Sequence, residues 1–383
     1  MPPPAPDRDA YRDWANLPEL PLAEVLRGLL PCLRSIYAFA ATCQPWRLLL
    51  RAIAGSLVRP RVPPLQLLYP ALRLAPISPL VAPRPIPYRL PVPAEGSTFL
   101  SASRGHLILL RRGSSNTLHL LDALAGADHG AIQLPSPHFP YHYAALSPSH
   151  LLLFHSKHAF FSRPSPMHPT PNNPSPDWTK HTLPRAASFV TTVLEFRGRV
   201  LGLTDRAQVL EFHLGSTTPS SASTPPNQTA RMLPIAGLPE PTAFDRSNYG
   251  PHLVAAGDRL LLVLFMLQPK LGYLEPVHRV NKIGVYVLDS AQMMWEEVDN
   301  IGPYTLFVDC AGRSAAACVD VGSCGVEENR VYVAAPNCRA WRKANPPGWE
   351  LSLNGEGGGL FSRGPMARPP LPSPISVYPP LFF

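Results

Sequence analysis

Val285-Tyr286-Val287-Leu288-Asp289, in the last third of the chain, is followed by Trp295-Glu296-Glu297-Val298 and then by Thr305-Leu306-Phe307-Val308. Each segment is a short apolar or aromatic run, and turn residues such as Gly302 separate them. Short apolar runs bounded by turn signals are typical of strands in an all-β domain. This stretch therefore predicts consecutive short strands rather than helices.

Runs of the same kind recur through most of the chain. They are His106–Leu110, Leu118–Leu121, Leu151–Phe154, Ala159–Phe161, Phe189–Phe196, Val200–Leu203, Val209–Leu214, His252–Ala255, Leu260–Met266, Ile283–Leu288 and Arg330–Ala334. Many short strands at nearly even spacing predict a sandwich, a barrel or a propeller. Two segments rich in Pro, Ser, Thr and Asn, 162–177 and 215–229, are predicted to be loops between strands.

A different pattern, with helical spacing, occupies the first sixty residues. Three groups of apolar residues each fall on one face of a helix: Leu22, Val25, Leu26 and Leu29; Leu33, Ile36, Tyr37 and Ala40; and Trp46, Leu49, Leu50 and Ile53. Pro21 and Pro45 suit first-turn positions, and Thr42 is predicted to be the N-cap of the third helix. So small a helical unit would gain stability from a partner or from the following domain.

Composition excludes several classes of function. The 383 residues include 50 prolines, and the net charge of +8 reflects few acidic residues rather than basic runs, so nucleic acid is not an expected partner. The longest apolar run, Leu260–Leu267, is too short to span a membrane, so no membrane partner is expected. Six cysteines without a CxxC pair and an N-terminus unlike a signal peptide predict an intracellular protein, in nucleus or cytoplasm.

The helical segment resembles an F-box. The matching residues are Leu17-Pro18-Glu19-Leu20, Val25-Leu26, Leu29, Cys43 and Trp46-Arg47. The resemblance implies that this unit docks a Skp-type adaptor and, through it, a cullin. The adaptor-binding residues that it implies are Leu17, Pro18, Leu20, Leu26, Leu29 and Arg47, and the F-box core residues are Val25, Cys43 and Trp46.

The remainder is similar to the kelch-related, propeller-like domain of a large plant F-box family. The likeness rests on Val285–Asp289, Trp295–Val298, Ile301-Gly302, Thr305–Val308 and Asn329–Val333, in the family's order. The implied fold class is α plus all-β, a small three-helix F-box followed by a β-propeller-like domain. Its predicted parts are a disordered proline-rich tail (1–13), the F-box (14–58), a proline-rich linker with a candidate first strand (59–93) and the recognition domain (94–383).

The resemblance implies a substrate-receptor subunit of a Skp–cullin–F-box ubiquitin ligase, with an unidentified target protein held on the β domain. Two alternatives stay open: an F-box regulator or decaying paralogue acting outside the ligase, and an enzyme on a propeller scaffold. No nucleophile motif is present, and neighbouring Glu296 and Glu297 would point to opposite faces of a strand. We therefore expect no enzyme and no catalytic residue.

Metal and cofactor sites are not expected either. Histidines gather between His138 and His168, but Pro140 prevents the helix that would align His138 with His142. The cysteine spacings match no zinc or redox motif. Gly357–Gly359 is not followed by the lysine and hydroxyl residue of a phosphate-binding loop.

Overall fold

The computed structural model divides the chain into two compact units, Met1–Val62 with Leu381–Phe383, and Pro63–Pro380. The structure describes residues 14, 17–29, 33–53, 65–68, 73–76, 88–89, 97–111, 116–122, 128–166, 177–214, 229–239, 251–270, 277–309, 315–318, 321, 326–334, 341–351 and 375–377. The predicted tail 1–13, the loop 215–228 and the Gly357–Gly359 turn lie outside these residues.

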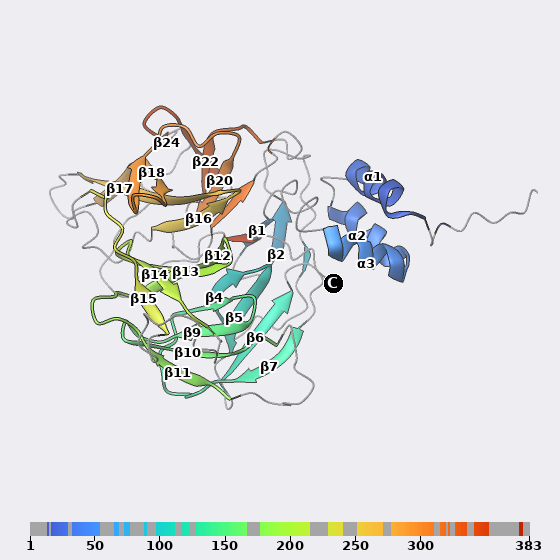
Figure 1. Cartoon of the computed structure of the whole chain (residues 1–383), viewed down its shortest axis with the longest axis horizontal. Coiled ribbons are helices and arrows are strands. Elements are labelled where there is room, and N and C mark those ends of the chain that lie inside the picture. Colours follow the sequence, from blue (N-terminus) through green and yellow to red (C-terminus); the bar gives the residue numbers. More distant parts are fainter. Residues whose placement is uncertain are drawn as a thin grey trace, which may run out of the picture. The chain divides into compact units, whose positions relative to one another are not determined.

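The first unit contains three short helices, α1 (Glu19–Leu29), α2 (Leu33–Thr42) and α3 (Gln44–Ile53) (Figure 1). Pro21 and Pro45 lie in the first turns of α1 and α3, where a missing N–H breaks no helical hydrogen bond. Thr42 is not an N-cap as predicted: it ends α2, and its hydroxyl donates to the Ala38 carbonyl at 3.0 Å. The apolar faces meet in one core of Leu22, Leu26, Ile36, Phe39, Ala40, Leu49 and Leu50.

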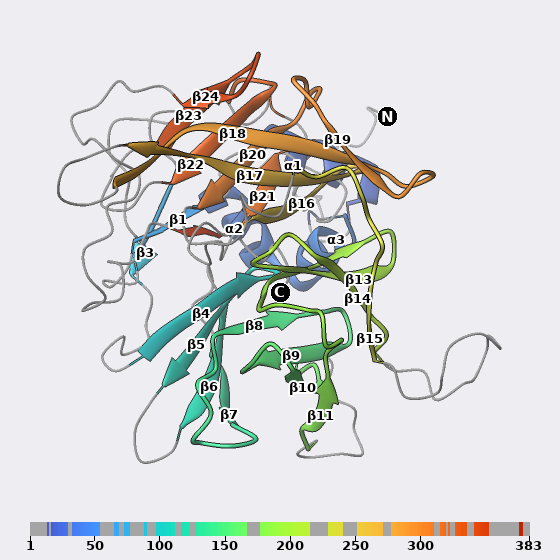
Figure 2. The ribbon, with the colours of Figure 1, turned by 90° about the vertical axis from the view of Figure 1, so that its left-hand side faces the viewer.

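The second unit is a β-propeller built from five hydrogen-bonded sheets, and Figure 2 shows the sheets arranged in a ring. The first is β25 (Ile375–Val377), β1 (Leu65–Leu68), β2 (Arg73–Pro76) and β3 (Tyr88–Arg89); the second is β4 (Ser97–Ser103), β5 (His106–Arg111), β6 (Thr117–Asp122) and β7 (Asp128–Gln133). The third is β8 (Tyr143–Leu146), β9 (His150–Phe154), β10 (Ala159–Pro164) and β11 (Thr179–Thr182); the fourth is β12 (Val190–Phe196), β13 (Arg199–Thr204), β14 (Val209–Phe212) and β15 (Ala230–Met232).

The fifth sheet has nine strands and is twice as wide as the others. Its first half is the meander β16 (His252–Ala256), β17 (Arg259–Lys270), β18 (Val277–Asp289) and β19 (Met294–Glu297). Its second half is β20 (Thr305–Asp309), β21 (Ala315–Cys318), β22 (Arg330–Ala334), β23 (Trp341–Asn345) and β24 (Glu350–Leu351). A single pairing, Lys282 with Glu350, joins the halves through β18 and β24. The ring closes where β25, late in the chain, pairs with β1.

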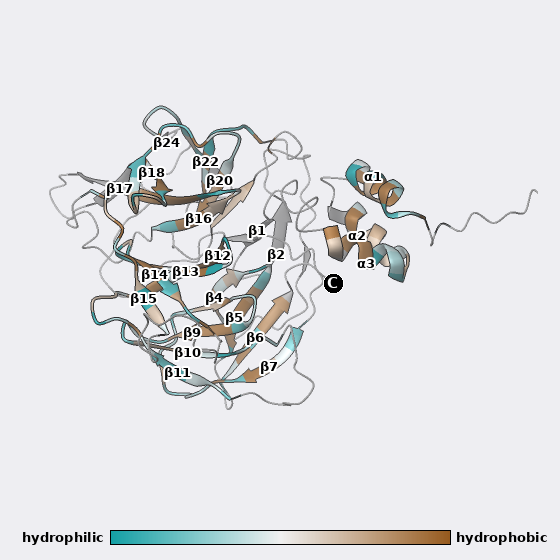
Figure 3. Cartoon of the chain, viewed as in Figure 1, coloured by the Kyte–Doolittle hydropathy of each residue, from teal (hydrophilic) through white to brown (hydrophobic). Residues whose placement is uncertain are grey.

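Apolar clusters fill the spaces between neighbouring sheets. Leu100 and Leu153 belong to the cluster between the second and third sheets, and Phe154 and Phe212 to the cluster between the third and fourth. A third cluster joins the fourth and fifth sheets, and a fourth, around Trp349, lies between the two halves of the fifth. Figure 3 shows the hydrophobic character of β5, β9 and β17, which supply these clusters. Burial between sheets therefore explains why the strands read as nearly continuous apolar runs.

The predicted strand positions agree with the observed ones. Every run identified above between His106 and Ala334 contains a strand, although β12 begins at Val190 rather than Phe189 and β14 ends at Phe212. The segment 162–177 was predicted to be a loop, but its first three residues belong to β10, which ends at Pro164. In the segment predicted as a linker, β1 occupies the candidate first strand, and β2 and β3 follow it in the same sheet. Proline is tolerated at strand ends, as at Pro76 in β2, so proline density alone does not separate a linker from an edge of a sheet.

Candidate functional site

The residues that carry the F-box resemblance all lie in the helical unit, but at different depths. Leu26 is fully buried in the core, and Leu17, Leu29 and Trp46 pack against that core while remaining partly exposed. Pro18 and Leu20 are on the surface, where 81% of Leu20 is accessible. The start of α1 thus presents a leucine and a proline to solvent directly beside a half-buried leucine.

Two of the predicted roles are corrected by this placement. Leu26, predicted to contact an adaptor, is a core residue, and Val25, predicted to belong to the core, is 44% exposed. The reason is helical geometry: at 3.6 residues per turn, Leu22, Leu26 and Leu29 lie within about 60° of one another, whereas Val25 lies at the edge of that stripe. Val25 is therefore available to a partner and Leu26 is not.

Side-chain hydrogen bonds to backbone carbonyls hold α3 against the rest of the helical unit. The Trp46 indole Nε1 donates to the Trp14 carbonyl at 3.0 Å, and its ring lies 4.6 Å from that of Phe39. Arg47 is exposed, and its Nε donates to the Ala40 carbonyl at 3.2 Å, near the C-terminal end of α2. Cys43, between α2 and α3, is a half-buried free thiol. Trp46 and Arg47 thus join α3 to the rest of the unit.

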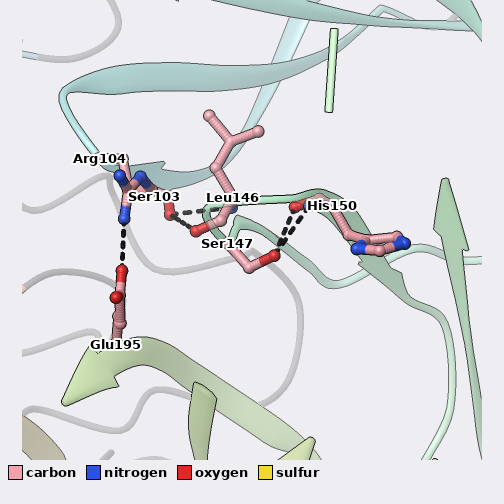
Figure 4. A network of polar contacts seen from close by, with 6 residues as sticks. All are labelled: Ser103, Arg104, Leu146, Ser147, His150 and Glu195. Carbon is pink, nitrogen blue, oxygen red and sulfur yellow. Dashed lines mark hydrogen bonds and ion pairs between the residues drawn. The ribbon is translucent and has the colours of Figure 1, made fainter. Parts of the chain in front are cut away.

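Polar side chains on the innermost strands join neighbouring sheets of the propeller. The Ser103 hydroxyl in β4 accepts from the Leu146 N–H at 2.9 Å and donates to the Leu146 carbonyl at 3.3 Å, as Figure 4 shows. Ser101 donates to the Ala144 carbonyl, and the Tyr143 hydroxyl accepts from the Val193 N–H at 2.9 Å. These bonds connect β4 to β8 and β8 to β12, and they are buried.

An ion pair extends this network between sheets that are not neighbours. Arg104 Nη1 in the β4–β5 turn lies 2.9 Å from Glu195 Oε2 in β12 (Figure 4). Arg104 has φ of 47° and Gly105 of 81°, and Arg197 and Gly198 repeat this arrangement in the β12–β13 turn with 50° and 74°. Two successive positive φ values define the tight hairpin turn that matches strand twist. Both turns place an arginine at the end of their sheet.

A histidine and an aspartate form the corresponding buried contact in the fifth sheet. His252 Nε2, in β16, donates to the Asp309 backbone carbonyl in β20 at 2.5 Å and lies 3.6 Å from the Asp309 carboxylate. Both side chains are completely buried. Burial lowers the pKa of His252 and so favours the neutral ring, an effect that Asp309 partly opposes.

One serine–histidine contact was missed by the sequence reasoning. Ser162 Oγ lies 2.7 Å from His181 Nε2, and His181 Nδ1 lies 3.0 Å from Thr229 Oγ1. Ser162 is 5% exposed, and Phe160 stacks on the histidine ring. A serine nucleophile needs access to its substrate and a base oriented by a third group, usually a carboxylate. Here the third group is a threonine, and the contacts join β10 and β11 to Thr229, the residue that precedes β15.

A shallow cavity of about 160 Å³ lies beside the segment that connects β7 to β8. Phe139, 37% exposed, stacks on His155 with ring centroids 4.6 Å apart, and the Tyr141 hydroxyl donates to the Ser136 carbonyl at 2.8 Å. The lining residues are Leu110, Asn116, Leu134, Pro137, His138, Phe139, Pro140 and Tyr141. Among the described residues that line this cavity there is no carboxylate and no pair of basic side chains.

Two findings concern metals and membranes. Within the described ranges, no group of three or more His, Cys, Asp or Glu side chains is placed to hold a metal ion, and His138 lies in a turn and His142 just before β8 rather than in a helix. In the same part of the chain, no helix has both the length and the apolar character required to cross a membrane.

Comparison with known families identifies the propeller. A family model described as "KIB1-4 beta-propeller" matches residues 80–359, which is well over half of the chain. No curated protein matches.

Several solved structures show weaker likeness to this chain. The N-terminal domain of Nup159 is 10% identical with a TM-score of 0.28, over 65% of this chain and 56% of that one. Kluyveromyces lactis Hsv2 is 11% identical with a TM-score of 0.27, over 56% of this chain and 65% of that one. PorZ of Porphyromonas gingivalis is 11% identical with a TM-score of 0.19, over 64% and 35%. The chain thus spans less than two thirds of these structures, and none of them informs its function.

Proposed function

This chain belongs to the KIB1-4 β-propeller family, a propeller suited to serve as a protein-interaction scaffold, and from that premise we propose that it is a substrate-receptor subunit of a Skp–cullin–F-box ubiquitin ligase. The helical unit docks a Skp-type adaptor, which connects the chain to a cullin in the nucleus or cytoplasm. The propeller holds a target protein. In this role the chain itself performs no catalysis. It acts by tethering, which raises the local concentration of target lysines near the conjugating enzyme that carries ubiquitin.

The exposure of Leu20 is the observation that carries this proposal. An 81% exposed leucine beside exposed Pro18 and half-buried Leu17 is costly to leave in water, and apolar residues clustered on a surface mark interaction sites. These residues stand in F-box order at the start of α1, in a compact unit separate from the propeller. Val25, also exposed, adds apolar surface on the same helix.

Adaptor binding is tested by co-purifying the full chain with a Skp-type adaptor. We expect Leu20→Ser to weaken binding by about tenfold, and a Leu17→Ala, Pro18→Ala double variant to weaken it more, because anchor residues dominate such interfaces. Phe189→Ser is the matched control, since Phe189 is a 43% exposed apolar residue of the propeller. Failure of the wild type to bind, or equal loss in the control, would contradict the proposal.

A second measurement separates the ligase receptor from an F-box regulator acting outside the ligase. Both would bind the adaptor, but only the receptor would bring a cullin into the complex and support ubiquitin transfer to a bound protein. A complex of chain and adaptor that excludes cullin would support the regulator. Association with cullin that depends on Leu20 would support the receptor.

A further inference from the structure

The fourth sheet contains a buried carboxylate held between two arginines. Glu211 in β14 is 6% exposed; Arg199 Nε, at the start of β13, donates to its Oε1 at 2.6 Å, and Arg231 Nη2, in β15, donates to its Oε2 at 2.7 Å. Arg231 stands directly opposite Glu211 in the β14–β15 pairing. We call Arg199, Glu211 and Arg231 the Glu211 cluster; its three strands lie side by side in Figure 1.

Glu211 stays ionised throughout the physiological pH range. The hydrogen bond from Arg199 and, to a smaller extent, the one from Arg231 lower the pKa of Glu211 to about 2, against the opposing effect of burial. Because both carboxylate oxygens are engaged, each guanidinium is fixed in position. Two arginines and one carboxylate leave the cluster with one formal positive charge.

Both guanidinium groups retain unused donors that face solvent. The Arg199 side chain is 45% exposed and the Arg231 side chain 54%. Arg199 engages Glu211 through Nε alone and Arg231 through Nη2 alone, and within the described residues neither side chain makes another hydrogen bond or ion pair. Neutralising Glu211 needs only one arginine, so the second cation and the free N–H groups are surplus to that task.

The neighbouring turn adds positive charge at the same end of the sheet. Arg197, two residues before Arg199, is exposed, and its Nη2 donates to the Asp258 backbone carbonyl at 2.8 Å. That contact satisfies one donor without neutralising the guanidinium, because the acceptor is a carbonyl. Arg197 reaches the β16–β17 turn, so a protein segment at the Glu211 cluster itself would meet Arg199 and Arg231, each hydrogen-bonded to Glu211.

From this geometry we propose that the Glu211 cluster is a docking site on the propeller for an acidic segment of the target protein, which it binds through the carboxylate of an Asp or Glu side chain. Guanidinium groups bind carboxylates through paired N–H donors, and fixing the arginines beforehand reduces the entropy lost on binding. This inference rests on the proposal that the propeller holds the target.

The charge of the cluster favours a carboxylate over a phosphate group. A carboxylate carries one negative charge, which matches the one formal positive charge of Arg199, Glu211 and Arg231. A phosphoserine carries about 1.5 to 2 negative charges at pH 7 and would lie beside an ionised, buried Glu211. The second negative charge of the phosphate would find no further cation within the cluster and would be repelled by Glu211, so a phosphorylated segment is expected to bind less well.

The proposal is tested by fluorescence anisotropy, with a labelled Glu–Gly repeat peptide as the probe and the full chain without adaptor. We expect Arg199→Gln and Arg231→Gln each to weaken binding by about tenfold, which corresponds to loss of one charge-assisted contact. Arg231→Lys keeps the charge without the fork and should fall between these and the wild type. Arg185→Gln is the matched control, because exposed Arg185 precedes β12 at the opposite end of this sheet.

Comparisons between peptides and between variants show whether the Glu211 cluster is the binding site. Weak binding of a Gln–Gly peptide, together with full binding by the Arg185 variant, would support the site. Equal losses in the Arg185 and Arg231 variants would reduce the effect to general charge attraction, and tighter binding of a phosphoserine peptide would overturn the choice of a carboxylate. No binding by the wild type, with its thermal unfolding normal, would also overturn it. Adaptor binding is measured separately, so either proposal can fail alone.

Discussion

In the helical unit every buried residue among those described is apolar, whereas the propeller also buries serines, histidines, a glutamate and an aspartate. The helices meet through one small cluster around Leu26, built from residues that are close in sequence. The propeller joins strands 43 residues apart through Ser103 and Leu146, and 57 apart through His252 and Asp309. The helical unit therefore assembles through the spacing of its apolar residues. In the propeller, specific polar contacts also determine which strands lie together.

The largest expected effect is on the stability of the helical unit. Leu26→Asp places a carboxylate in the core around Ile36 and Leu50, at a cost on the order of 4 kcal/mol or more, which a unit of this size cannot sustain. We expect loss of helical circular dichroism and of adaptor binding, with the propeller's unfolding transition retained.

Val25→Asp is the matched control for that experiment, because Val25 is the preceding residue and is 44% exposed. It should leave the helices folded and disturb only adaptor binding. Equal unfolding by both variants would contradict the assignment of Leu26 to the core and Val25 to the surface.

The next effect concerns the polar contact within the fifth sheet. His252→Leu removes the N–H that donates to the Asp309 carbonyl in a fully buried site, and we expect a loss of about 2 kcal/mol in the free energy of unfolding. Because the pKa of His252 is below its ordinary 6.5, its contribution is complete above that pH and declines as the pH falls below it.

Thermal unfolding between pH 7.5 and pH 5 measures both parts of this prediction. The His252→Leu variant should be less stable than the wild type at pH 7.5 and should lose less stability on acidification. His158→Gln, at an exposed histidine, provides the control. A variant as stable as the wild type at pH 7.5 would show that the contact contributes nothing.

The sequence predicts local structure well because local structure depends on neighbouring residues. The spacing of Leu22, Leu26 and Leu29 places α1, and the run Leu260–Met266 places β17. Short or polar strands are not predicted in this way. β11, for example, contains only Thr179–Thr182, and these residues are recognised as a strand only by their pairing with β10. The prediction failed at Val25 because a residue at the edge of an apolar stripe can belong to either side.

The candidate sites were less predictable, because they depend on pairings distant in sequence. Arg199, Glu211 and Arg231 come from three strands, and Glu211 and Arg231 are twenty residues apart in the sequence. No local pattern indicates that they meet. The residues that resemble an F-box could be identified because they lie within one short segment, where a linear motif and an exposed surface coincide.

The smallest effect concerns the buried charge of the propeller, which has no counterpart among the described core residues of the helical unit. Glu211 has a folded-state pKa of about 2 against an ordinary 4.5, so its contribution is complete above pH 4.5 and is lost as the pH falls toward 2. Because both arginines are about half exposed, solvent screening reduces that contribution to on the order of 1 kcal/mol.

Comparing unfolding at pH 5 and pH 3 should show a smaller acid-induced loss of stability in Glu211→Gln than in the wild type. Glu296→Gln, at an exposed carboxylate, should behave as the wild type, and an identical acid response in all three proteins would remove Glu211 from the residues that stabilise the propeller.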